Sequence, residues 1–265
     1  MDTFQVTWIP TNTRTGSTWT TSIVREILGV ERINVLPKRL LRDPAETMSI
    51  YRKKVANDKN ENNHYVLPTH NLVRYHLPRS RYITNMRNPF EICASYYEFM
   101  NLHSETINLE AAIEAALGLP RFIKYYSRLT YNKEKCFILN FDHIEEQPEN
   151  LIEKLSKFLG VVVDEKTVEK LGKKYSKENL REIINENDKN LAEKLVNGEE
   201  INSEEIIVRQ IDDVRSFDID TGYQSGTIST RGKGEWRTIF SRSQIKRIIE
   251  ALNDVAIEMG YESEI

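Results

Sequence analysis

The chain has 265 residues, of which 39% are hydrophobic and 29% charged, a composition that excludes a disordered or fibrous protein. Its formal net charge of −3 argues against general nucleic-acid binding, and no apolar run approaches the ~18 residues of a membrane span. Cys93 and Cys136 lack metal-ligand spacing and are interpreted as buried thiols of a reducing compartment. Because the N-terminus also lacks the features of a secretory signal, we expect a cytoplasmic protein with no membrane or nucleic-acid partner.

Short apolar strands alternate with helices along most of the chain. Strands are predicted at residues 4–10, 64–69, 81–86 and 135–141. Helices are predicted at residues 16–28, 89–100, 109–117, 122–129, 149–159 and 243–259. Between residues 176 and 220 the pattern weakens, and we interpret this stretch as amphipathic helical pieces and loops. The alternation predicts an α/β fold, a central parallel β-sheet flanked by helices, in a single domain spanning residues 1–265.

The segment Thr-Arg-Thr-Gly-Ser-Thr-Trp at residues 13–19 lies between the first predicted strand and helix. Such a turn directs several backbone N–H groups and the positive end of a helix dipole at one spot, which favours an anion. Gly16 allows close approach of the backbone, and Arg14 adds a permanent charge with forked geometry. The segment is therefore a candidate P-loop-like phosphate-binding strand-loop-helix. The alternative is a capped helix beside a stray arginine.

A second candidate phosphate site begins at Arg87-Asn88-Pro89. Arg87 ends a predicted strand, and the carboxyl ends of strands are where α/β sheets bind ligands. Ser95 follows two turns into the next helix, so the two side chains could grip one phosphate. The alternative is a strand end followed by a helix with core aromatic residues. A third, glycine-rich basic segment lies at residues 229–236, and by itself it is equally well a basic turn.

In this order the three segments resemble the cofactor motifs of the cytosolic-type family of sulfotransferases that use 3′-phosphoadenosine 5′-phosphosulfate (PAPS). Residues 13–19 resemble the 5′-phosphosulfate loop Pro-Lys-Ser-Gly-Thr-Thr-Trp, with Arg14 at the lysine position and Thr13 at the proline position. The resemblance implies that the cofactor contacts the residues from Arg14 to the end of this loop: Thr15, Gly16, Ser17, Thr18 and Trp19, the last against the adenine.

The other two segments resemble the parts of the family that bind the 3′-phosphate. Residues 87–97 resemble Arg-Asn-Pro-x-Asp-x-x-x-Ser-Tyr-Tyr, which implies that Arg87 and Ser95 bind this phosphate. Residues 229–236 resemble Arg-Lys-Gly-x-x-Gly-Asp-Trp with a one-residue deletion. The cofactor-binding residues implied there are Thr230, Arg231, Gly232 and Lys233, and Lys233 could supply the charge that is missing at Thr230.

Sulfuryl transfer requires in-line positioning, stabilisation of the leaving phosphate and a base for the acceptor. We expect Arg14 to stabilise the leaving phosphate and expect no metal. His70 resembles the histidine of the family's Lys-Thr-His segment and is the predicted general base, with Pro68 in place of the lysine. His76 or a carboxylate is the alternative base, and His70 could instead only satisfy a strand end.

The resemblance implies an enzyme that converts PAPS to 3′-phosphoadenosine 5′-phosphate (PAP) while it sulfates a small-molecule acceptor. One alternative is a non-catalytic protein that binds PAP or PAPS, although such a protein would be expected to lose Arg14 or His70. The other is a P-loop-like kinase of small molecules, but the GxxxxGK[ST] pattern is absent. The sequence identifies neither the acceptor nor the oligomeric state.

Overall fold

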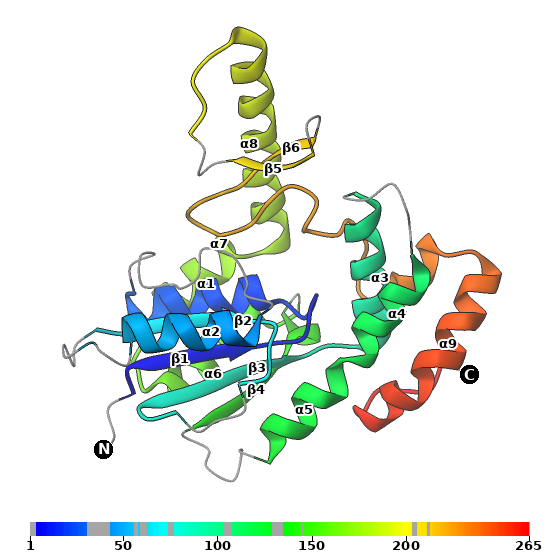
Figure 1. The fold of residues 1–265 in the computed structure, drawn as a ribbon, viewed down its shortest axis with the longest axis horizontal. Helices are drawn as coiled ribbons and strands as arrows, with labels where there is room; N and C mark the ends of the chain where they lie inside the picture. The colour runs from blue at the N-terminus through cyan, green and yellow to red at the C-terminus, as the bar shows by residue number, and fades with distance from the viewer. Residues whose placement is uncertain are drawn as a thin grey trace.

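A parallel β-sheet forms the centre of the computed structural model, which describes residues 4–30, 43–55, 58, 63–73, 77–102, 108–128, 135–144, 146–202, 206–210 and 213–264. Within these ranges the sheet has four strands in the order β2-β1-β3-β4, all paired in parallel (Figure 1). The strands are β1 (Val6–Pro10), β2 (Tyr65–Thr69), β3 (Ser80–Met86) and β4 (Cys136–Asn140). The predicted central parallel sheet is confirmed, and the carboxyl ends of its strands meet at one edge.

Helices cover both faces of this sheet. Successive side chains of each strand point to opposite faces, so each strand contributes to two hydrophobic cores. Ile9 and Ile83 belong to a core with side chains of α1, α6, α7 and α8. Trp8 and Tyr82 belong to a core on the other face, formed with α5 and the turn that follows α2. The helices are α1 (Ser17–Leu28), α2 (Pro44–Ile50), α5 (Leu119–Ser127), α6 (Pro148–Leu159), α7 (Glu165–Lys174) and α8 (Lys177–Asn197).

A third core joins three helices that lie beside the sheet, α3 (Pro89–Asn101), α4 (Leu109–Leu117) and α9 (Arg242–Glu258). Trp236 is buried in this core and stacks on Phe90, with ring centroids 4.8 Å apart. The predicted break between two helices at Gly118 is confirmed. The second of them, α5, begins three residues earlier than predicted, since Pro120 suits the first turn of a helix.

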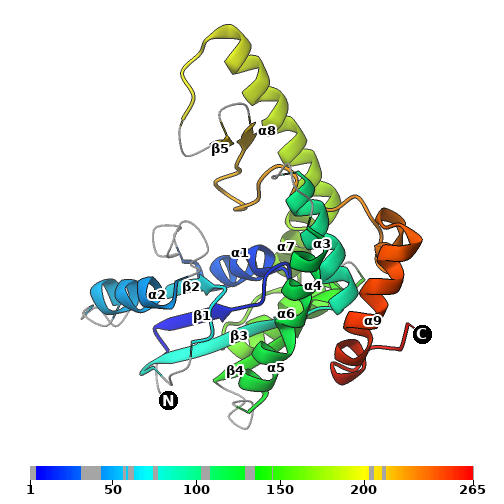
Figure 2. The same cartoon turned by 45° about the vertical axis from the view of Figure 1, so that its right-hand side comes forward.

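The stretch from residue 176 to 220 differs from its prediction. Its first part is one continuous helix, α8, which is 21 residues long, begins after the N-cap Ser176 and ends at Gly198. No glycine or proline interrupts it, so nothing breaks it into pieces. An antiparallel hairpin of β5 (Ile206–Gln210) and β6 (Asp213–Ser216) follows, which the sequence did not predict. Figures 1 and 2 show that α8 and this hairpin project away from the sheet.

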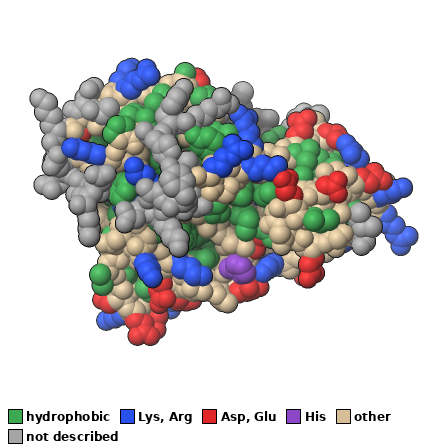
Figure 3. All heavy atoms as spheres, turned by 90° about the horizontal axis from the view of Figure 1, so that it is seen from below, with side chains coloured by type: hydrophobic (Ala, Val, Ile, Leu, Met, Phe, Trp, Pro, Cys, Tyr) green, Lys and Arg blue, Asp and Glu red, His purple; other side chains and the backbone are tan. Residues whose placement is uncertain are grey.

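The surface seen in Figure 3 carries acidic and basic side chains interspersed, in keeping with the small net charge of the chain. None of the helices in the described ranges has the length and apolarity needed to cross a bilayer.

Candidate active site

The loop between β1 and α1 turns sharply at the carboxyl edge of the sheet. Arg14 and Gly16 both have left-handed backbone conformations, with φ of 59° and 86°. The Thr15 hydroxyl donates to the carbonyl oxygen of Asn12 at 2.7 Å, and the Asn85 side chain on β3 donates to the carbonyl oxygen of Thr15 at 2.9 Å. The conformation of the loop is therefore held by its own hydroxyl group and by the neighbouring strand. Asn85 was missed by the sequence analysis.

Helix α1 begins in a way that leaves its first turn open to an anion. Its N-cap is Gly16, which has no side chain to accept hydrogen bonds from the first-turn N–H groups. The ring of Phe141 lies against the same glycine, where an added Cβ would stand 2.0 Å from Phe141 Cε2. The tryptophan predicted to contact adenine, Trp19, is 2% exposed and meets Phe141 edge-on, with centroids 6.5 Å apart. Glycine is thus required at position 16 by conformation and by packing.

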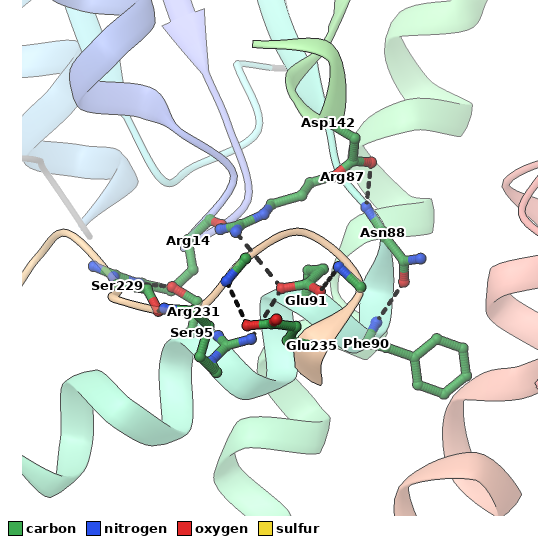
Figure 4. A network of polar contacts seen from close by, with 12 residues as sticks. Arg14, Arg87, Asn88, Phe90, Glu91, Ser95, Asp142, Ser229, Arg231 and Glu235 are labelled. Atoms are coloured by element: carbon green, nitrogen blue, oxygen red, sulfur yellow. Dashed lines mark hydrogen bonds and ion pairs between the residues drawn. The ribbon is translucent and has the colours of Figure 1, made fainter. Parts of the chain in front are cut away.

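The three polar side chains assigned to phosphate groups converge at this turn (Figure 4). Arg14 Nε donates to Ser95 Oγ at 3.0 Å, and Arg14 Nη2 donates to the carbonyl oxygen of Thr227, also at 3.0 Å. Arg87 Nη1 donates to the carbonyl oxygen of Arg14 at 2.9 Å. Arg87 and Ser95 lie more than 70 positions after Arg14 in the sequence, and the fold brings these two guanidinium groups and the hydroxyl group together at the loop that precedes α1. Such a donor set fits phosphate or sulfate oxygens.

The start of α3 is fixed by Asp142, which lies in the short 3-10 turn after β4 and had no role in the predicted site. The backbone N–H of Asn88 donates to Asp142 Oδ2 at 2.8 Å, and the Tyr261 hydroxyl donates to the same oxygen at 2.6 Å. The Asn88 side chain caps α3 by accepting from the backbone N–H of Phe90 at 2.9 Å. These hydrogen bonds fix the backbone directly after Arg87. They also give the Asn-Pro pair a structural role, since Asn88 caps α3 and Pro89 occupies its first turn.

The glycine-rich basic segment at residues 229–236 lies against α3, but its charged side chains are paired with carboxylates. Arg231 Nη1 donates to Glu91 at 3.1 Å, and Arg231 Nε donates to Glu98 at 2.8 Å. Lys233 is exposed and pairs with Glu146 at 2.8 Å. Thr230 and Gly232 are exposed. The structure therefore brings Arg231 near Ser95 on α3 (Figure 4). Lys233 instead pairs with Glu146, which lies in the turn after β4.

His70 follows the last residue of β2 and is half-buried. Its Nδ1 lies 2.9 Å from the carbonyl oxygen of Thr11, the residue that follows β1. Because a carbonyl oxygen only accepts, Nδ1 carries the proton, and in the neutral ring Nε2 holds the basic lone pair. The Thr11 hydroxyl oxygen is buried and has no hydrogen-bond partner among the described atoms. His76, the alternative base, lies outside the described residues.

Fold and site together define an α/β protein with a P-loop-like anion site at the carboxyl edge of a parallel sheet. No three His, Cys, Asp or Glu side chains gather as a metal site would require in the ranges that the structure covers. The family model described as "Sulfotransferase domain" matches residues 5–212 of the chain. The chain belongs to this family and is a PAPS-dependent sulfotransferase.

Solved structures of sulfotransferases share this fold. Mouse sulfotransferase SULT7A1 complexed with PAP is 13% identical, with a TM-score of 0.59, and the alignment covers 97% of this chain and 88% of the mouse chain. Retinol dehydratase in complex with retinol and PAP is 14% identical, with a TM-score of 0.62, and the alignment covers 99% of this chain and 83% of the dehydratase. The comparison with curated proteins found no match.

Proposed function

We propose that this single-domain protein, residues 1–265, transfers the sulfuryl group of PAPS to a hydroxyl or amine group of a small acceptor and releases PAP. The observation that carries the proposal is the convergence of Arg14, Arg87 and Ser95 at the uncapped N-terminus of α1. The PAP that accompanies the solved relatives supports the choice of nucleotide. The buried, unpaired thiols of Cys93 and Cys136 support the predicted cytoplasmic location.

The phosphosulfate end of the cofactor is assigned to the first turn of α1. The backbone N–H groups of residues 16–18 and the hydroxyl groups of Ser17 and Thr18 would bind its oxygens. The Arg14 guanidinium, which donates to Ser95 and to the carbonyl oxygen of Thr227 in this structure, would neutralise the charge that develops on the leaving phosphate. This donor set meets the electrostatic requirement of the reaction without a metal ion.

The 3′-phosphate is assigned to Arg87 and Ser95, and residues 230–233 are assigned to the segment that closes over the bound nucleotide. Arg87 approaches from the end of β3, and Ser95 lies on the facing side of α3. Trp19 and the neighbouring Phe141 are assigned to the side of the site that receives the adenine.

His70 is proposed as the general base. The contact with Thr11 keeps Nδ1 protonated, which leaves Nε2 to take the acceptor proton. His70→Ala is expected to lower turnover by roughly 10²-fold or more, the usual contribution of a positioned base, while the Kd for PAP stays unchanged.

The comparison variant for this assignment is His76→Ala, for which we expect a small effect in the same steady-state assay. Loss of turnover in His76→Ala but not in His70→Ala would reverse the assignment. Full turnover in both variants would point to a carboxylate base.

The acceptor is proposed to be a small molecule with a hydroxyl or amine group. Retinol and androsterone occur in complexes of a solved relative, retinol dehydratase. A screen of phenols, alcohols, amines and sugars with radiolabelled PAPS tests the activity directly. PAP binding without transfer to any acceptor would favour a non-catalytic binding protein, and turnover of ATP in place of PAPS would favour a kinase.

A further inference from the structure

Arg231, which the family motif places at the 3′-phosphate, is already bound by two acidic residues of α3. Its Nε and Nη2 atoms donate side-on to the two oxygens of Glu98, at 2.8 and 3.0 Å. Its Nη1 atom donates to Glu91 at 3.1 Å. The side chains of Arg231 and Glu91 are only 6% and 7% exposed, and that of Glu98 is 25% exposed. The cation therefore lies between two carboxylates, largely shielded from water.

This pairing makes Arg231 a poor ligand for a phosphate. A phosphate at its guanidinium would lie beside Glu91 and Glu98, and the repulsion between like charges is strong where water is scarce. Breaking the buried pair would also leave carboxylates without their partner, which is costly. Burial alone would lower the pKa of Arg231, but the hydrogen bonds and charges of Glu98 and Glu91 raise it. Arg87 differs, because its contact with the Glu91 carboxylate is 4.0 Å long.

The same contacts fasten the glycine-rich segment to α3. The backbone N–H of Gly234 donates to Glu91 Oε1 at 2.9 Å, so Glu91 holds the segment at two points. On the other side of the segment, Lys177 on α8 donates to the carbonyl oxygen of Arg231. Residues 229–235 are thus held between α3 and α8, and they pass close to Ser95 and Arg14 (Figure 4). Arg231 is the one member of this segment whose side chain joins it to Glu98.

We propose that Arg231 is a positioning residue: it acts through Glu98 and Glu91 to hold residues 229–235 over the cofactor site, while the contact with the 3′-phosphate belongs to Arg87. The inference rests on the proposed function for the identity of the cofactor. It assigns to Glu98 a role in cofactor affinity that the family motif does not include.

The test compares PAP with adenosine 5′-phosphate, which lacks only the 3′-phosphate, by calorimetry on Glu98→Gln and Arg231→Met. Each substitution is expected to weaken both ligands by the same factor, about tenfold, which corresponds to about 1.4 kcal/mol. The double variant is expected to lose no more than either single variant, because the two residues act as one unit. The Arg87→Ala variant, by contrast, is expected to weaken PAP selectively.

The matched control is Glu110→Gln. Glu110 receives the same side-on pair of hydrogen bonds, from Arg247 at 3.0 and 2.8 Å, but on the exposed surface of α4 and α9. Glu110→Gln should leave the affinities for PAP and for adenosine 5′-phosphate unchanged. Tighter PAP binding by Glu98→Gln would show that a freed Arg231 binds the phosphate, and would overturn the proposal. Selective loss of PAP in Arg231→Met would overturn it as well.

A second arm needs no nucleotide. In the ligand-free protein, amide hydrogen exchange at Gly232 and Gly234 should accelerate in Glu98→Gln and stay unchanged in Glu110→Gln. Unchanged exchange in Glu98→Gln would overturn the positioning role even if the nucleotide affinities fell. If the wild-type protein bound neither nucleotide, the proposed function would fail, and the exchange rates would still decide whether Glu98 holds the segment.

Discussion

Replacing Gly16 with alanine tests the geometry of the candidate phosphate loop most sharply. An L-residue at the φ of 86° costs about 1–2 kcal/mol of left-handed strain. The added Cβ would also stand 2.0 Å from Phe141 Cε2 and 2.2 Å from Cδ2, so the aromatic ring must move. Overpacking of this kind costs about 1–3 kcal/mol. Together these terms predict that Gly16→Ala lowers the free energy of unfolding by about 2–5 kcal/mol.

Gly29→Ala is the matched control, at the other end of the same helix. Gly29 has a φ of 60°, and an added Cβ there meets nothing within 4 Å, so only the strain term applies. Urea unfolding followed by circular dichroism gives both free energies. In a Phe141→Ala background the cost of Gly16→Ala should fall to that of Gly29→Ala, because the ring is gone. Equal costs of the two alanine substitutions in the unmodified chain would refute the packing around Gly16.

Three further predictions concern the phosphate ligands, pH and metal ions. Calorimetry of Arg87→Ala and Ser95→Ala should show PAP weakened far more than adenosine 5′-phosphate, and equal losses would contradict their assignment to the 3′-phosphate. Burial, with a smaller contribution from the charge of Arg81, lowers the pKa of His64 from 6.5 to about 4, so the unfolded chain binds a proton that the folded chain excludes. The free energy of unfolding should therefore fall as the pH drops from about 6.5 to about 4, by at most about 3 kcal/mol, and denaturant titrations of His64→Gln should lack this component. Turnover should survive EDTA, because Arg14 and backbone amides can carry the transition-state charge, and activity that EDTA abolishes and magnesium restores would exclude this mechanism.

Local signals in the sequence predicted the elements that carry the site. The apolar run before residue 11 and the glycine at position 29 defined β1 and α1, and Asn88-Pro89 marked the start of α3, as the structure confirms. Helix α2 was missed although Asp43 accepts from the N–H of Ala45 and Pro44 occupies the first turn, a start signal that the sequence contains. The β5–β6 hairpin gave no comparable signal.

The parts of the site that the sequence did not predict depend on contacts between distant segments. Arg231 and Glu98 are 133 positions apart, and nothing in either local pattern indicates that they meet. Phe141 directly follows β4, and the fold places its ring against Gly16 and 5.4 Å from the Arg87 guanidinium. Short sequence motifs predict which backbone turns can bind an anion. Only the assembled sheet and helices determine which charges remain available to it.

Calorimetric titration with PAP is the most direct measurement of the central claim, because the assigned site binds the nucleotide whether or not the acceptor is known. The account predicts binding of PAP at about micromolar strength or better, with a matching rise in the melting temperature. No binding of PAP, together with binding of ATP, would contradict it.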